Sequence, residues 1–221
     1  MMDKEVMIEM LVERELAMFR VVNGDEHTNC QNNPNAFRAM RRAQFLAWSD
    51  ATIESYLDDL ETAAGTRNLL REKYIRMMRS TDPVSYAKLV KELPPLTEEK
   101  KTLVEEIWDL MLEQTEKLRA EFPALAYGGR PLHAADEYDG LTSIETYQTS
   151  ELYTYSEKTL QLLLEHIKKL KKDNIDIVYE IQRNSLACMG FSTIADAAQV
   201  LERQHAENKK PQNSQCSCSV N

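Results

Sequence analysis

The feature that most constrains the fold is residues 35–61, a long stretch that contains neither glycine nor proline. Asn33 is a good N-cap residue, and Pro34 suits the first helical position. At the other end, Gly65 supplies a C-terminal stop. The stretch therefore predicts one long helix around which the rest of the chain is organised.

Helical spacing gives this stretch two different faces. One is an apolar stripe made of Leu46, Ile53, Leu57, Leu60 and Ala64. The other mixes aromatic and hydrogen-bonding groups, namely Phe37, Arg41, Gln44, Trp48, Thr52, Ser55 and Asp59. A surface helix needs only one apolar stripe, so this helix is either central in a bundle or forms one wall of a pocket.

The composition favours helices. The chain has 221 residues, enough for one domain with a sizeable core, and only 6 Gly and 7 Pro, which argues against a turn-rich β architecture. Seven further stretches read as helices, at residues 3–22, 67–80, 83–92, 97–122, 142–172, 175–189 and 193–205. We expect an all-α, single-domain bundle of about seven or eight helices over residues 1–207, followed by a disordered polar tail at 208–221.

Charge and motif content exclude several classes of function. The net charge of −9 disfavours non-specific nucleic-acid binding. No stretch is long and apolar enough for a membrane span, and the first residues lack the features of a signal peptide, so we expect a cytoplasmic protein. His27 and Cys30 are spaced like two metal ligands, but no second pair follows nearby, and we expect no metal and no cofactor.

Two later segments indicate where a site could lie. Residues 123–141 form a long connection with Gly128, Gly129 and Arg130, either a lid or pocket rim or merely a tolerated excursion. The helix at 142–172 opens with the capping box Thr142–Glu145. Its leucine stripe is replaced by hydroxyl groups over the first turns, so that end should face a polar cavity, a polar stripe of another helix, or water.

Several blocks of the chain resemble a known family. They are Met18-Phe19 with Cys30-Gln31, FRAMRRAQFLAWSDATIESYLDDLE, NLLREKYIRMM, GGRP and TSIETYQTSELYTYS. Together they make the chain similar, from about Glu15 to Ala197, to a bacterial helical family known only as a domain of unknown function (the four-one-two-five family). The resemblance implies a helical fold and no particular activity.

The polar and aromatic residues within these blocks suit a pocket that orients a polar ligand. We expect the ligand-binding residues to be Arg41, Gln44, Trp48, Arg130, Glu145, Tyr147 and Glu151. One hypothesis is a site that binds, with or without transforming, a small polar or anionic molecule between the two long helices. The alternative is a helical interaction or regulatory module, and a homo-oligomer is compatible with either.

If both polar stripes are internal, the least costly arrangement places them against each other. We therefore predict an ion pair between Arg41 and one of Glu145 or Glu151, with Arg130 closing the rim. Proton transfer, if the protein is an enzyme, would fall to one of these glutamates or a tyrosine.

Overall fold

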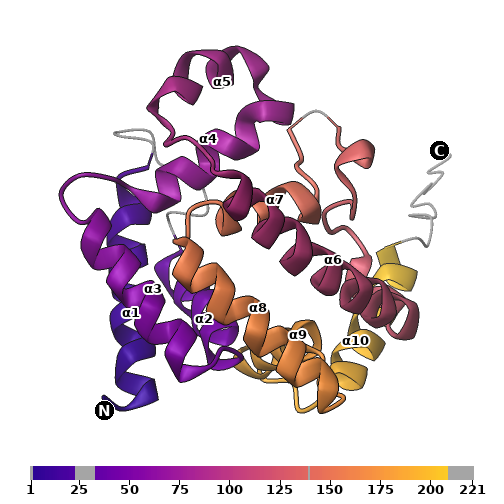
Figure 1. The fold of residues 1–221 in the computed structure, drawn as a ribbon. Coiled ribbons are helices and arrows are strands. Elements are labelled where there is room, and N and C mark those ends of the chain that lie inside the picture. Colours follow the sequence, from indigo (N-terminus) through magenta and orange to yellow (C-terminus); the bar gives the residue numbers. More distant parts are fainter. Residues whose placement is uncertain (1, 23–32, 139, 209–221) are drawn as a thin grey trace, which may run out of the picture.

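The computed structural model describes residues 2–22, 33–138 and 140–208, and this part of the chain contains ten α-helices and no strand (Figure 1). The helices are α1 (Lys4–Arg20), α2 (Pro34–Leu46), α3 (Asp50–Ala63), α4 (Leu69–Thr81), α5 (Pro83–Leu89), α6 (Glu98–Glu121), α7 (Ile144–Leu152), α8 (Glu157–Lys172), α9 (Ile177–Cys188) and α10 (Ile194–Asn208). Short 3₁₀ turns lie at Val90–Glu92 (η1), Pro123–Ala126 (η2) and Ala134–Asp136 (η3). The all-α prediction is confirmed, although the predicted number of helices is too low.

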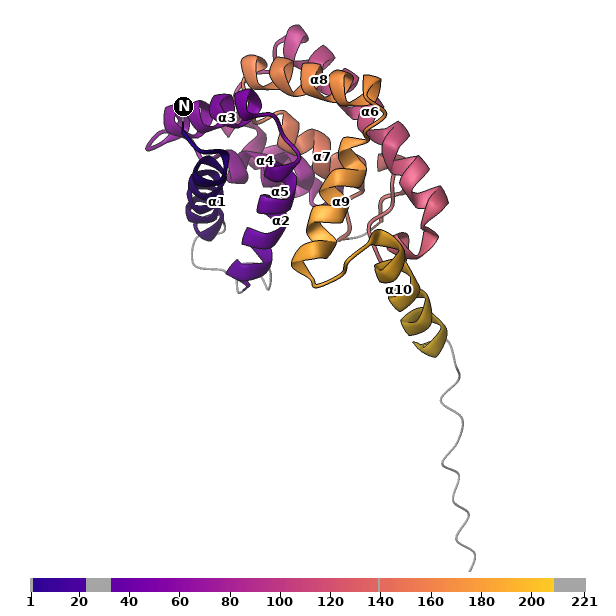
Figure 2. The same ribbon diagram turned by 90° about the horizontal axis from the view of Figure 1, so that it is seen from below.

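The helices form two packed layers. Seen from below, α1, α2, α9 and α10 follow one another in a row, and consecutive members are in contact (Figure 2). The second layer contains α3, α8 and α6, with α8 packed against both of the others (Figure 1). Helices α4 and α7 contact each other and lie across one end, where α4 also packs against α1 and α7 against α6.

The prediction of one long helix over residues 35–61 is wrong, because the chain bends between α2 and α3. Ser49 is the N-cap of α3, and its hydroxyl accepts a hydrogen bond from the Thr52 amide at 3.2 Å. The carbonyls left open at the end of α2 also find donors. Lys4 donates to the Trp48 carbonyl at 2.7 Å, and the His166 ring nitrogen Nε2 lies 2.9 Å from the Ala47 carbonyl oxygen.

The predicted helix over residues 142–172 is likewise two helices, α7 and α8. Ser156 caps α8 by accepting from the Thr159 amide, and its own amide donates to Asp59 on α3 at 2.9 Å. Ser143, not Thr142, is the N-cap of α7. These two breaks turn the eight predicted helices into ten.

Other helix boundaries follow the sequence signals closely. Asn33 caps α2 with Pro34 at the first position, Asp82 caps α5 ahead of Pro83, and Thr97 caps α6. The chain turns after α3 at Gly65, whose φ of 75° favours glycine. No helix within the described ranges is both long and apolar enough to cross a membrane. The predicted tail, apart from its first residue, and the His27–Cys30 pair lie outside the described residues.

Candidate functional site

The most unusual feature of the interior is a cluster of four charged side chains, which we call the charge cluster: Glu15, Arg41, Lys73 and Glu151. They come from α1, α2, α4 and α7, and their relative exposures are 0%, 5%, 2% and 4%. Two positive and two negative groups make the cluster electrically balanced. Fully buried charges are rare unless they are paired, so the geometry of the pairs decides what the cluster can do.

Arg41 is the hub of this network. Its Nε and Nη2 donate to the two carboxylate oxygens of Glu15, at 2.5 and 2.7 Å. Its Nη1 donates to Glu151 Oε1 at 2.8 Å and to Gln44 Oε1 at 2.9 Å. The guanidinium also lies 4.9 Å from the centre of the Phe45 ring. The predicted ion pair of Arg41 is thus confirmed with Glu151, and it is not formed with Glu145.

Glu151 is held by neutral as well as charged donors. Besides Arg41, two neutral groups donate to Glu151 Oε1: the Gln44 side-chain amide at 3.0 Å and the Tyr155 hydroxyl at 2.6 Å. The other oxygen, Oε2, accepts from Lys73 at 2.5 Å. On the opposite side, the Tyr56 hydroxyl donates to Glu15 at 2.7 Å. Each carboxylate therefore has a cation and a tyrosine as donors.

Tyr147 lies against two cations. The Lys73 ammonium is 3.5 Å from the centre of its ring, and the Arg130 guanidinium is 5.2 Å from it. Arg130 itself donates to the carbonyl of Thr142 at 2.9 Å and also to its hydroxyl. Arg130 therefore holds the loop before α7 against the start of that helix, instead of closing a rim over the charge cluster as predicted.

The environment fixes the ionisation of the cluster. Burial alone would raise the pKa of the Glu151 carboxyl, but Arg41 and Lys73 outweigh it and hold this pKa well below its usual range. Burial alone would lower the pKa of Lys73, yet Glu151 keeps it above its ordinary value. Burial, together with the nearby carboxylates, raises the pKa of Tyr56 and of Tyr155 well above its ordinary value.

These shifts limit the chemistry of the charge cluster. A general base or acid works best when its pKa lies near the working pH. Glu151 is a weak base with all of its charge compensated, and the two tyrosines are weak acids. The cluster therefore suits the fixing of helix positions and of local charge, and it is poorly suited to proton transfer at neutral pH.

The predicted site residues fall into four groups. Arg41, Gln44 and Glu151 meet in the charge cluster. Trp48, which is 3% exposed, packs edge to face on Tyr155 with ring centroids 5.7 Å apart. Tyr147 and Arg130 lie beyond Lys73, and Glu145 is separate, accepting from the Ala134 amide at 2.8 Å.

Glu15 and Lys73 complete the cluster, and neither was predicted to belong to it. Glu15 carries a signal in the sequence: it follows Leu11 by four residues and precedes Phe19 by four, so it lies on the apolar face of α1. A carboxylate on such a face needs a buried cation. Lys73 lacks such a signal, because lysine is common on exposed helix faces.

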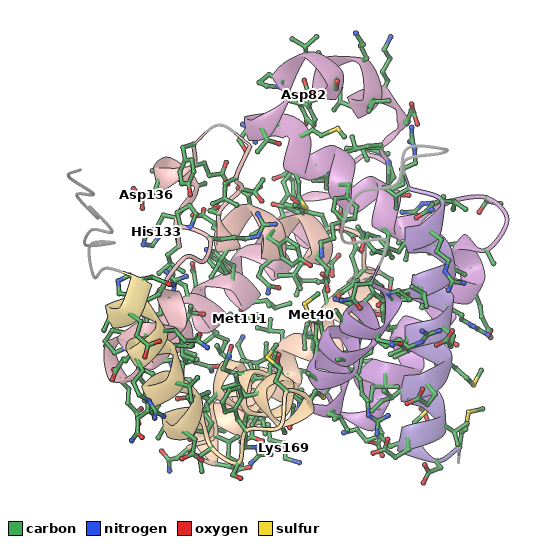
Figure 3. The ribbon with its side chains drawn as sticks, turned by 180° about the vertical axis from the view of Figure 1, so that it is seen from behind. Met40, Asp82, Met111, His133, Asp136 and Lys169 are labelled. Carbon is green, nitrogen blue, oxygen red and sulfur yellow. The ribbon has the colours of Figure 1, made fainter. Side chains whose placement is uncertain are left out.

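Two adjoining cavities lie beside the charge cluster, and we call them the inner and outer chambers of one cleft. The inner chamber has a volume of about 40 Å³, and Gln44, Trp48 and Glu151 are among its walls. The outer chamber, of about 200 Å³, lies between α6, α7, α9 and η2. Met111, Gln148 and Ile181 line both chambers, which are therefore neighbours. Met111 lies near the middle of the face shown in Figure 3, which views the molecule from behind.

A larger pocket of about 830 Å³ lies between α1, the end of α3 and α4. The three arginines among its described lining residues already have carboxylate partners: Arg14 pairs with Glu61, Arg67 with Glu72 and Arg71 with Glu92. The charges of this pocket are thus compensated from within. Of the predicted site residues, none is among the described residues that line it.

Comparison with protein families gives a match over residues 5–199 to the model described as "Protein of unknown function (DUF4125)". This chain belongs to the DUF4125 family. The matched region contains the whole charge cluster and all the residues of both chambers of the cleft, so these features lie within the DUF4125 region of the chain. Neither the curated proteins nor the solved structures contain a match to the chain.

Proposed function

We propose that this protein binds a small polar or anionic molecule in the cleft between α6, α7 and α9. The observation that carries the proposal is that three of the residues expected to bind a ligand, Gln44, Trp48 and Glu151, line the inner chamber of that cleft. Ligand sites generally combine mostly apolar walls with a few polar groups that fix orientation. The cleft has this composition.

The rigidity of the inner wall supports the same proposal. Gln44 and Glu151 are fixed by the charge cluster, and Trp48 is packed between Phe45, Tyr56 and Tyr155, with ring centroids 5.1 to 5.8 Å away. A pre-organised wall reduces the entropy that is lost on binding. The charge cluster would then serve to hold the walls of the site in place.

The alternative, an interaction module that presents its polar residues to a partner, needs those residues at the surface. Arg41, Trp48 and Glu151 are at most 5% exposed. This burial favours the small-molecule proposal. A cytoplasmic location and a homo-oligomer remain predictions.

Native mass spectrometry of the protein purified from its native host tests the proposal. We expect a co-purified small molecule on the wild type and its loss from Gln148→Trp, which places a large ring between the two chambers. Thr66→Trp, in the 830 Å³ pocket, is the matched control and should retain the molecule. Loss from Thr66→Trp with retention by Gln148→Trp would overturn the assignment to the cleft.

A further inference from the structure

We infer that the ligand of this cleft is a small carboxylate with an apolar body, and that Arg119 binds the carboxylate group. This inference rests on the proposed function and specifies its ligand. It is carried by the charge, the walls and the size of the outer chamber.

Arg119 is a half-buried cation that has no acidic partner among the described residues. It lies on α6 and lines the outer chamber, and its Nη2 donates to the Arg130 carbonyl at 3.1 Å. Within the described part of the chain it forms no ion pair, in contrast to Arg14, Arg67 and Arg71 around the larger pocket. Burial lowers the pKa of Arg119, and no carboxylate in the described ranges offsets this effect. An anionic ligand would supply the missing partner.

The mostly apolar walls of the outer chamber favour an apolar body in the rest of the ligand. Trp108, Leu118 and Ile181 are among its apolar lining groups, and Gln148 and Gln182 add amides. No aspartate or glutamate among the described residues lines this chamber, so a cation would find no partner there. An apolar body can pack between α6 and α9, while the carboxylate remains at Arg119.

The inner chamber fixes the orientation. The lining of that chamber is mostly apolar, with Leu163 and Ile167 among its groups, and Glu151 is already paired with Arg41 and Lys73. This chamber therefore favours the apolar end of a ligand. The outer chamber, with a volume of about 200 Å³, limits the size of the ligand. A short-chain or single-ring carboxylate is a small ligand of the kind that suits such a chamber.

Calorimetric titration with hexanoate, hexanamide and hexylamine tests the inference, because the three differ mainly in the charge of the head group. We expect hexanoate to bind the wild type at least tenfold more tightly than hexanamide, and hexylamine to bind most weakly. Arg119→Gln should abolish the preference for hexanoate, and Arg119→Lys should retain part of it. Arg183→Gln removes an exposed arginine of α9 and should leave the preference unchanged.

The outcomes separate this inference from the proposed function. Equal affinities for hexanoate and hexanamide, both lost in Gln148→Trp, would overturn the inference about Arg119 while the cleft remained a small-molecule site. A hexanoate preference that persists in Arg119→Gln would also overturn it. Thermal melts of each variant show whether the fold is retained, so a loss of affinity with an unchanged melting temperature supports the direct contact.

Discussion

Arg41 donates two parallel hydrogen bonds to Glu15, from Nε at 2.5 Å and from Nη2 at 2.7 Å, between helices α1 and α2. This pair is buried, and it is joined to Glu151 through the same guanidinium. Glu151 has a second cation in Lys73, whereas Arg41 provides both nitrogens that bind Glu15. The two carboxylates therefore depend on Arg41 to different degrees.

Arg41→Ala should lower the free energy of unfolding by about 3–5 kcal/mol, because it leaves a buried carboxylate without its cation. Adding Glu15→Gln should recover more of this loss than adding Glu151→Gln, since Glu151 keeps Lys73. Urea unfolding of the single and double variants measures both effects. Arg38→Ala is the control: Arg38 lies on α2 like Arg41, its pair with Glu13 on α1 is exposed, and its loss should have little effect. A neutral Arg41→Ala would show that the charge cluster is not formed.

The two serine caps give a second prediction. Ser49→Ala and Ser156→Ala should each destabilise the protein by about 0.5–2 kcal/mol, because each removes the acceptor for an amide at the start of α3 or α8. Thr102→Ala, at an exposed position inside α6, should be close to neutral. Thermal and urea unfolding measure the change. If α2 and α3 were one helix, Ser49→Ala would instead stabilise it slightly, since alanine is the better helix former.

Acid should weaken the contribution of Glu151. Its carboxyl has a lowered pKa in the folded protein and returns to about 4.5 in the unfolded chain. Its stabilisation is therefore fully present above that pH and is lost as the pH falls toward the folded value, because the unfolded chain takes up the proton first. The difference in urea midpoint between the wild type and Glu151→Gln should shrink between about pH 6 and about pH 3.5. A constant difference over this range would contradict the lowered pKa.

Much of the fold could be predicted because its helix ends use local signals. Asn33, Asp82 and Thr97 are caps that the sequence identifies, each by its own side chain. Ser49 and Ser156 were missed as caps because each lies in a stretch without glycine or proline, where the helical pattern continues on both sides of it. A signal was nevertheless present.

That signal is a repeated local sequence. The sequence Trp48-Ser49-Asp50 comes just before Thr52, and the similar sequence Tyr155-Ser156-Glu157 comes just before Thr159. The second segment follows the first by 107 residues, which is also the sequence separation of Gln44 and Glu151, two residues joined by a hydrogen bond. In each segment a serine follows an aromatic residue and caps a new helix, and the two aromatic rings pack on each other.

The candidate site was only partly predictable. Arg41 and Glu151 could be paired in advance, because two buried helix faces of opposite charge have to meet. The cleft depends on how α9 and η2 pack against α6, which is set by tertiary contacts among ordinary apolar residues. Arg119 had no signal of its own, since it looks like any exposed arginine near the end of a helix.

Methyl spectra of protein labelled with ¹³C-methionine test the binding proposal most directly, because the Met111 side chain lines both chambers of the cleft. Met189, which is 66% exposed on the segment after α9, serves as the internal control. We predict that the low-molecular-weight fraction of an extract of the native host shifts the Met111 signal and leaves Met189 in place, and that Gln148→Trp abolishes the shift. An unchanged Met111 signal in the wild type, or the same shift in Gln148→Trp, would contradict a small-molecule site in this cleft.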